Sequence, residues 1–188
     1  MRIWPATVLA GITIALASGS GQRATIVKPL TQGPVTYFAN QCSRCHGPSG
    51  SNYVLDSLRK RTSVSLKHEI SEMASGPGQM PLKGRDLDAQ VALHEAIMKG
   101  IPFLSLTKVS GTSISGEVVG TNKVLLRQGA RVISARVVDA TWTASIPASW
   151  LPINQPIWVI AGLKKQAVMD LSKNPASVGL VKDLKPPR

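Results

Sequence analysis

The stretch that decides how this chain folds and what it can bind is Cys42-Ser43-Arg44-Cys45-His46. It holds both cysteines of the 188-residue chain, in the spacing C-x-x-C-H. Two thiols at this spacing on a turn can each form a thioether with a vinyl group of one haem, and the next imidazole then lies under the iron as an axial ligand. The motif predicts one covalently attached haem c, held by Cys42 and Cys45, with His46 bound to its iron.

Other interpretations of the two cysteines have less support. A structural disulfide or a redox dithiol also uses C-x-x-C, but no βαβ pattern surrounds this pair. A zinc site needs four ligands, and outside the motif only His68 and His94 offer imidazole nitrogens, at an unusual spacing. A chance arrangement is disfavoured because both cysteines lie at one offset beside a histidine.

The residues that lead into the motif, Tyr37-Phe38-Ala39-Asn40-Gln41, together with the motif and the glycine after it, carry a family resemblance. This stretch resembles the first helix and haem site of class I monohaem cytochromes c, and the resemblance extends over residues 34–104. It implies an all-helical fold wrapped around the haem and single-electron transfer as the activity. The final helix, 86–99, departs from the family because it lacks the aromatic residue that usually packs on the first helix.

The resemblance also implies a second axial ligand, usually a methionine on a loop rich in Gly and Pro. Residues 75–82, Ser-Gly-Pro-Gly-Gln-Met-Pro-Leu, fit that loop, so Met80 is the candidate. Met73 and Met98 lie on helical apolar stripes and are expected to pack in the core. His68 and His94 stay open as alternatives that would give the iron two histidine ligands.

The apolar pattern predicts helices first and strands afterwards. The helices are expected at 34–42, 63–74 and 86–99, and the strands at 112–119, 123–126, 130–138, 141–146 and 157–163. Residues 138–161 resemble bacterial immunoglobulin-like modules in their spacing of tryptophan, proline and turns. Trp142 and Trp158 are expected in the core of this part, and Trp150 is expected to be available at the surface.

We therefore expect a two-part fold, in which an all-α cytochrome c domain precedes a small all-β domain. The β part is expected to be an immunoglobulin-like sandwich, with a barrel as the alternative. The expected limits are 1–17 for a signal peptide (23 at the outermost), 24–104 for the haem domain, 105–171 for the β module and 172–188 for an extended tail.

The first residues have the pattern of a secretory signal. Arg2 precedes an apolar run over 8–16, and Ala15 and Ala17 form an A-x-A cleavage site. The run is shorter than the ~20 residues that span a bilayer, so no membrane span is expected in the mature chain. We expect a periplasmic or otherwise exported protein, which agrees with the compartment in which bacteria attach haem c.

Positive charge dominates the chain, with 22 Lys and Arg against 10 Asp and Glu and a formal net charge of +12. An exported protein rarely meets nucleic acid, so we expect redox partner proteins with acidic docking surfaces, approached through long-range fields, with an anionic membrane surface as the alternative. Arg44, Lys83 and Arg85 lie in or near the motif and the Met80 loop. They are candidates to pair with haem propionates or with such a partner.

These observations predict an exported electron carrier with one haem that is ligated by His46 and Met80. Two alternatives stay open: a cytochrome subunit bound permanently to a periplasmic oxidoreductase complex, and a haem-based gas sensor. The chain shows no Ser/His/Asp set and no paired carboxylates, so it is not expected to be an enzyme by itself.

Overall fold

The computed structural model describes residues 26–53, 61–151, 155–173 and 178–179. The predicted signal peptide, residues 1–17 with 23 as its outer limit, lies outside this part of the chain, and so does most of the tail predicted for 172–188. Within the described residues, no helix has both the length and the apolar character needed to cross a bilayer.

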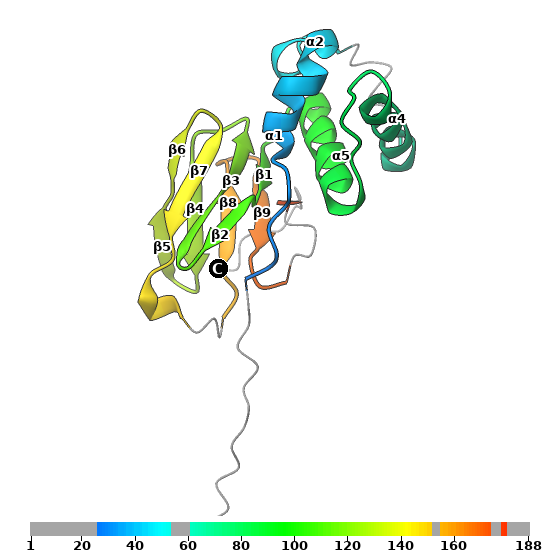
Figure 1. The fold of residues 1–188 in the computed structure, drawn as a ribbon. Helices are drawn as coiled ribbons and strands as arrows, with labels where there is room; N and C mark the ends of the chain where they lie inside the picture. Colours follow the sequence, from blue (N-terminus) through cyan, green and yellow to red (C-terminus); the bar gives the residue numbers. More distant parts are fainter. Residues whose placement is uncertain (1–25, 54–60, 152–154, 174–177, 180–188) are drawn as a thin grey trace, which may run out of the picture.

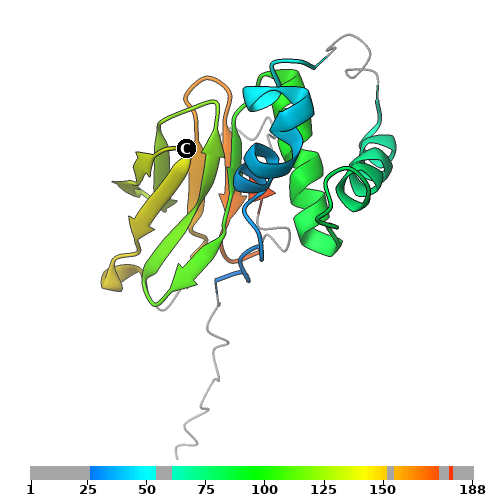
Figure 2. The same cartoon turned by 45° about the horizontal axis from the view of Figure 1, so that its top comes forward.

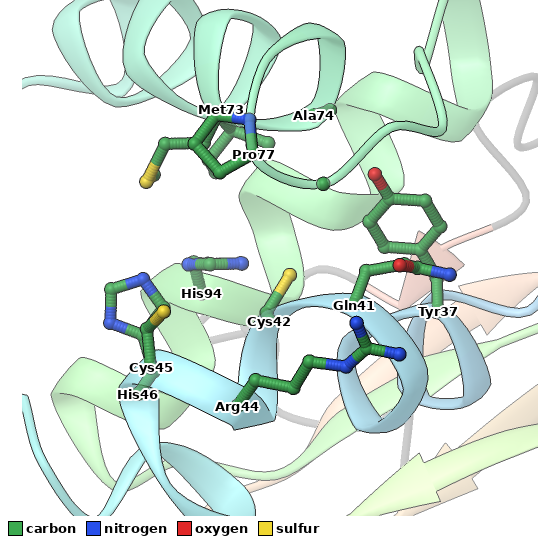
Figure 3. A pocket seen from close by; sticks show the side chains of 12 residues that line it. Tyr37, Gln41, Cys42, Arg44, Cys45, His46, Met73, Ala74, Pro77 and His94 are labelled. Carbon is green, nitrogen blue, oxygen red and sulfur yellow. The ribbon is translucent and has the colours of Figure 1, made fainter.

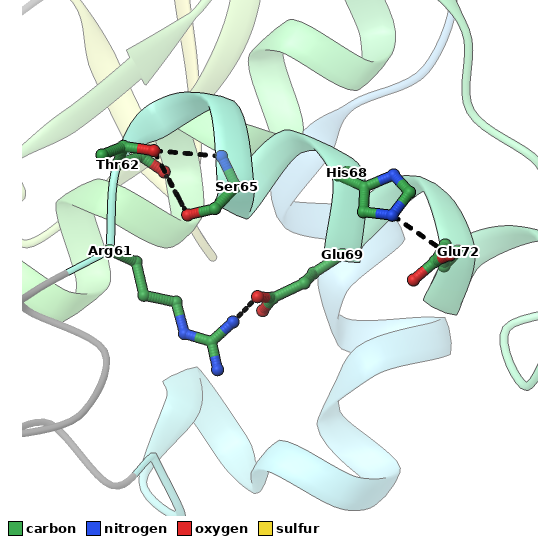
Figure 4. Close-up of polar contacts among 6 residues, drawn as sticks. All are labelled: Arg61, Thr62, Ser65, His68, Glu69 and Glu72. Carbon is green, nitrogen blue, oxygen red and sulfur yellow. Dashed lines mark hydrogen bonds and ion pairs between the residues drawn. The ribbon is translucent and has the colours of Figure 1, made fainter.

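The helical part begins with a continuous helix in three segments and has two longer helices after it (Figure 1). The three segments of the first helix are α1 (Pro34–Tyr37), the π-helical turn η1 (Phe38–Cys42) and α2 (Ser43–His46). The 3₁₀ turn η2 (Pro48–Gly50) follows, and the two longer helices are α4 (Ser63–Ser75) and α5 (Gly84–Lys99). The Thr62 side chain caps α4 by accepting the amide of Ser65 at 3.2 Å (Figure 4). The three helices predicted from periodicity are confirmed at about their expected limits.

In the described residues after α5, ten strands form two antiparallel sheets. They are β1 (Phe103–Ser105), β2 (Lys108–Ser110), β3 (Ser113–Val119), β4 (Val124–Gln128), β5 (Arg131–Ser134), β6 (Arg136–Val138), β7 (Thr141–Ser145), β8 (Trp158–Ala161), β9 (Ala167–Asp170) and β10 (Val178–Gly179). The first sheet has the order β10-β1-β3-β7-β6, with β2 also paired to β3, and the second has the order β5-β4-β8-β9. A 3₁₀ turn, η3 (Ala148–Trp150), follows β7.

Inward side chains of both sheets form one buried core, with Trp142 of β7 fully enclosed in it. The indole Nε1 of Trp142 donates to the carbonyl of Ser105 at 3.0 Å. Gly116, opposite Trp142 on β3, makes this contact possible, because a Cβ at residue 116 would lie 1.7 Å from the same carbonyl oxygen. Trp158 is half-buried, and Trp150 is only 3% exposed, so the prediction of a surface position for Trp150 is wrong.

The predicted fold class, an all-α cytochrome domain followed by an immunoglobulin-like sandwich or barrel, is also wrong. The fold is mostly β, and α1 and α5 pack against the first sheet, while α4 lies on the other side of α5 (Figures 1 and 2). Leu93 of α5 shares a buried cluster with Phe103 of β1 and Val178 of β10, while Leu87 and Val91 on another face of α5 pack with α4. Because α5 is apolar on two faces, it is buried on both, and one of them needs the sheet.

The N-terminal segment joins the two layers as well. Ile26 and Val27 pack against the β core, and the amide of Leu30 donates to the carbonyl of Leu106 at 2.9 Å. From the other side, the Arg85 guanidinium donates to the carbonyls of residues 28 and 29, and Asp86 accepts the amide of residue 31 at 3.0 Å. Asp86, in the first turn of α5, thus holds this segment against the helix. From residue 26 on, the described chain therefore runs along the β layer before it enters the helices.

Glu117 of β3 fixes the start of the first helix. Glu117 is only 6% exposed. Its carboxylate accepts hydrogen bonds from the amide of Val35 at 2.6 Å, the amide of Thr36 at 3.1 Å and the Thr36 hydroxyl. These amides belong to the first helical turn, which has no acceptors of its own. Gly33 leaves room for the carboxylate, because a Cβ there would lie 2.3 Å from Oε1.

Replacing Glu117 by alanine is expected to lower the free energy of unfolding by about 2 kcal/mol, because two part-buried amides lose a charged acceptor. Glu72→Ala is the matched control, since Glu72 is exposed on α4 and makes only a surface ion pair with His68; its cost should stay below about 1 kcal/mol. Urea denaturation of both variants measures the difference. Equal losses of stability would contradict the role given to Glu117.

Candidate functional site

The C-x-x-C-H motif forms one wall of a cavity beside the first helix. Cys42 ends η1, and Cys45 and His46 lie on α2, which Gly47 terminates with a positive φ of 74°. Both thiols are free, and both line the cavity together with His46. Because they lie on one helical turn, all three predicted haem-attachment groups point into this cavity, as Figure 3 shows.

The opposite wall comes from α4 and the loop after it. Ile70, Met73 and Ala74 line it from α4, followed by Pro77 and Gly78. In Figure 3, Met73 and Pro77 lie across the cavity from His46, with the Met73 sulfur turned toward it. The sequence-based prediction placed Met73 in a helical core, whereas the structure leaves it 37% exposed and at the cavity.

The space between these walls has a volume of about 810 Å³, including its open mouth. Arg44 is the only permanently charged side chain among the described residues that line it. Of the three cations proposed for haem propionates, Arg44 is thus at the cavity, while Lys83 is exposed before α5 and Arg85 is bonded to the N-terminal segment. A mostly apolar cavity with a few polar groups is typical of a cofactor site.

His94 of α5 forms part of the same lining and is almost fully buried, at 3% exposure. Its Nδ1 lies 2.6 Å from the Tyr53 hydroxyl, and its ring packs edge-on against Phe38 with centroids 5.3 Å apart. His94 thus contacts the first helix through Phe38, in the same cluster region as Leu93. The sequence named His94 only as an alternative iron ligand. Its place among the buried residues of α5 was the signal that it lies inside the protein, at the cavity.

Met80 lies outside the cavity lining and is 41% exposed. Two contacts hold it near the motif: its carbonyl accepts the Tyr37 hydroxyl at 2.7 Å, and its sulfur accepts Gln41 Nε2 at 3.0 Å. The loop that carries Met80 is therefore fastened to the first helix close to Cys42. The prediction that Met80 binds iron stays a prediction.

His68, the other histidine considered as a ligand, is on the outer face of α4. Its Nε2 lies 3.2 Å from the Glu72 carboxylate, one turn along the helix, and its side chain is 73% exposed (Figure 4). The cavity lining does not include it.

Burial controls the charge of the groups at the motif. It raises the pKa of the Cys42 thiol to about 11, and the neighbouring Cys45 adds to this effect. Burial also lowers the pKa of His46 and so favours the neutral imidazole, which is the form that binds a metal. The site thus holds a protonated thiol at Cys42 and an uncharged ring at His46 near neutral pH.

These features fit a covalently bound haem. Thiols and an imidazole line one wall, the other walls are largely apolar, and the buried Nε2 of His94 has no hydrogen-bond partner in the described part of the chain. They fit a zinc site less well, because the described residues contain no group of three or more His, Cys, Asp or Glu arranged to hold a metal ion. No protein-family model matches the chain, and no curated protein matches it either.

The buried His94 predicts how the stability of the haem-free chain depends on pH. Burial, and secondarily the nearby His46, lowers the pKa of His94 to about 3 from its ordinary 6.5. Between these values only the unfolded chain carries a proton on His94, so stability should fall as pH falls through this window, by up to about 1.4 kcal/mol per pH unit.

Urea denaturation at a series of pH values measures this slope on protein produced without haem attachment. His94→Leu should make the slope shallower, and His68→Leu, which replaces an exposed histidine, should leave it as in the wild type. A slope that is the same in all three proteins would assign the acid sensitivity to other groups.

Proposed function

We propose that this protein carries single electrons through one covalently bound haem c. The observation that carries the proposal is the convergence of Cys42, Cys45 and His46 on one wall of a largely apolar cavity. A haem held there supplies a one-electron Fe(III)/Fe(II) couple. The roles described below belong to the side chains of this chain.

Cys42 and Cys45 hold the haem covalently. Each thiol would add its sulfur and its hydrogen across one vinyl double bond of the haem, an addition from which no atom leaves and which needs no oxidant. The spacing of one helical turn lets both sulfurs reach neighbouring vinyl groups of one ring. The reduced state of both cysteines is the state that this addition requires.

His46 would hold the iron through its neutral imidazole, and Met80 would hold it through its sulfur. Met80 lies on a loop fastened to the first helix through Tyr37 and Gln41, so its sulfur is close to the cavity mouth. An iron with protein ligands on both sides favours passing electrons over binding a substrate. Arg44, at the cavity, is the proposed partner of a haem propionate.

The net charge of +12 supports acidic redox proteins as donors and acceptors. Export also belongs to the proposal, because the covalent attachment of haem in bacteria takes place outside the cytoplasm.

Haem should remain on the polypeptide after denaturation of protein produced in a host that attaches haem c. A denaturing gel stained for haem peroxidase activity should show a band for the wild type and for Ser43→Ala, which changes the motif but keeps both thiols. The band should be lost in Cys42→Ala/Cys45→Ala, because no thioether can form. An unstained wild-type protein would refute the proposal.

A redox titration tests whether the bound haem is a one-electron carrier. Spectra of the purified native protein, recorded during a redox titration, should follow a reversible one-electron curve. A tenfold change in the ratio of oxidised to reduced protein should correspond to about 59 mV. Irreversible behaviour, or steady turnover of a substrate by the purified chain, would argue for a different activity.

A further inference from the structure

Two turns at one end of the β layer form a positively charged tip. One joins β3 to β4 (residues 120–123), and the other joins β8 to β9 (residues 162–166). They lie side by side, because β4 pairs with β8 and the amide of Gly162 donates to the carbonyl of Lys123 at 3.1 Å. In Figure 2 the second turn is the orange loop at the top of the sheets. We call the two turns together the lysine tip.

The lysine tip carries three exposed ammonium groups. Lys123, Lys164 and Lys165 are all exposed, and none of them forms an ion pair with another residue of the described part of the chain. Residues 119–123 and 161–166 contain no Asp or Glu. No acidic side chain of these turns cancels the positive field, so it acts on charges within about 8–10 Å at physiological ionic strength.

An exposed leucine stands beside these charges. Leu163 is 67% exposed and directly precedes the two lysines of the β8–β9 turn. The turn holds it in place, because Gln166 Nε2 donates to the Leu163 carbonyl at 3.4 Å. Gly162 makes the turn tight, since it has a φ of 93° and a Cβ there would lie 2.3 Å from the carbonyl oxygen of Lys165. The tip thus presents an apolar side chain on a preformed turn.

An open hollow lies beside the tip, with a volume of about 590 Å³ that includes its open side. Its lining includes Thr121, Lys164 and Lys165. Thr121 Oγ1 accepts the amide of Lys123 at 3.1 Å, so its hydroxyl hydrogen can donate to an oxygen in the hollow. Two ammonium groups and a hydroxyl are donors that suit the phosphate of a lipid headgroup.

The composition of the tip favours a lipid surface over a protein partner. The cores of protein–protein interfaces are enriched in aromatic residues, Met and Arg and depleted of Lys. The two turns contain no aromatic residue and no Arg, and all their cations are lysines. Lysines near an anionic membrane are attracted to its surface, and an aliphatic side chain beside them can enter the boundary between headgroups and acyl chains.

We propose that the lysine tip binds the surface of a membrane that contains an anionic phospholipid such as phosphatidylglycerol. Its three lysines contact the headgroup phosphates, and Leu163 inserts between the headgroups. The inference goes beyond the proposed function and does not require the haem, since no residue of the tip lines the cavity at the motif. A carrier held in this way meets membrane-embedded redox proteins by diffusing in two dimensions.

Sedimentation of the full chain with vesicles measures the binding. Vesicles of equal parts phosphatidylglycerol and phosphatidylcholine should bind the protein, and pure phosphatidylcholine vesicles should bind it far less. Salt at about 1 M should release it, because the field then reaches only about 3 Å. Lys164→Ala/Lys165→Ala should weaken binding about 25-fold, since each lysine near an anionic surface strengthens it about fivefold. Lys108→Ala/Lys173→Ala is the matched control, because it removes two exposed lysines outside the tip, and it should weaken binding less than about twofold.

The contribution of the leucine has its own pair of variants. Leu163→Ala should weaken binding to the anionic vesicles about fivefold, because less apolar area leaves water on insertion. Val64→Ala is the matched control, since Val64 is 80% exposed on α4, and it should bind as the wild type does. The apolar run over 8–16 is the same in every variant, so it cancels from these comparisons.

Hydrogen exchange locates the contact on the protein. Anionic vesicles should slow exchange of the amides in residues 120–123 and 162–166. They should leave residues 129–130 unchanged, because the turn between β4 and β5 lies at the opposite end of the second sheet.

Three results would overturn the inference. The first is equal binding to the two kinds of vesicle. The second is an equal loss of binding in the two double-lysine variants, which would show a general attraction of charge and no particular surface. The third is a set of tip amides that the vesicles leave unprotected; their protection by poly-L-glutamate in the same buffer would then assign the tip to an acidic protein partner. The haem stain of the proposed function is read separately, so failure of either proposal is distinguishable from failure of the other.

Discussion

The carboxylate of Glu117 is the interaction on which the arrangement of this protein depends. It accepts the first amides of the helix that carries the C-x-x-C-H motif, and it does so from β3, a strand inside the first sheet. Such a bond fixes both the position and the direction of the helix, because the acceptor is charged and the donors point along the helix axis. The thiols at the far end of that helix are thereby placed relative to the sheet.

The cavity exists because two buried clusters meet on either side of the first helix. One cluster joins α4 to α5, and the other joins α5 to the sheet, and Cys42 packs at the margin of both. Since α5 takes part in both clusters, a polar residue on its buried surface has no route to solvent. His94 is in that position, and its hydrogen bond to Tyr53 satisfies only one of its two nitrogens.

Helices and longer strands were predictable because their signals are local. The periodicity of 63–74 and 86–99 indicates helices by itself, and the helices observed there are α4 and α5. The short strands β1, β2, β9 and β10 were missed, because two to four residues carry no period. In addition, β10 pairs with β1 across more than 70 residues, and no local pattern shows such a pair. Trp150 was misplaced for the same reason, since its burial depends on the fold of both sheets.

The sequence by itself determined that two thiols and an imidazole lie close together, because that depends only on their spacing along one helical turn. It did not determine that the helices share a core with the sheet, since an apolar stripe shows that a helix face is buried but not which surface covers it. Nor did it determine that Met73 and His94 line the cavity while Met80 lies beside it. These positions depend on how α4 and α5 pack against the first helix, and that packing is set by contacts between residues far apart in the chain.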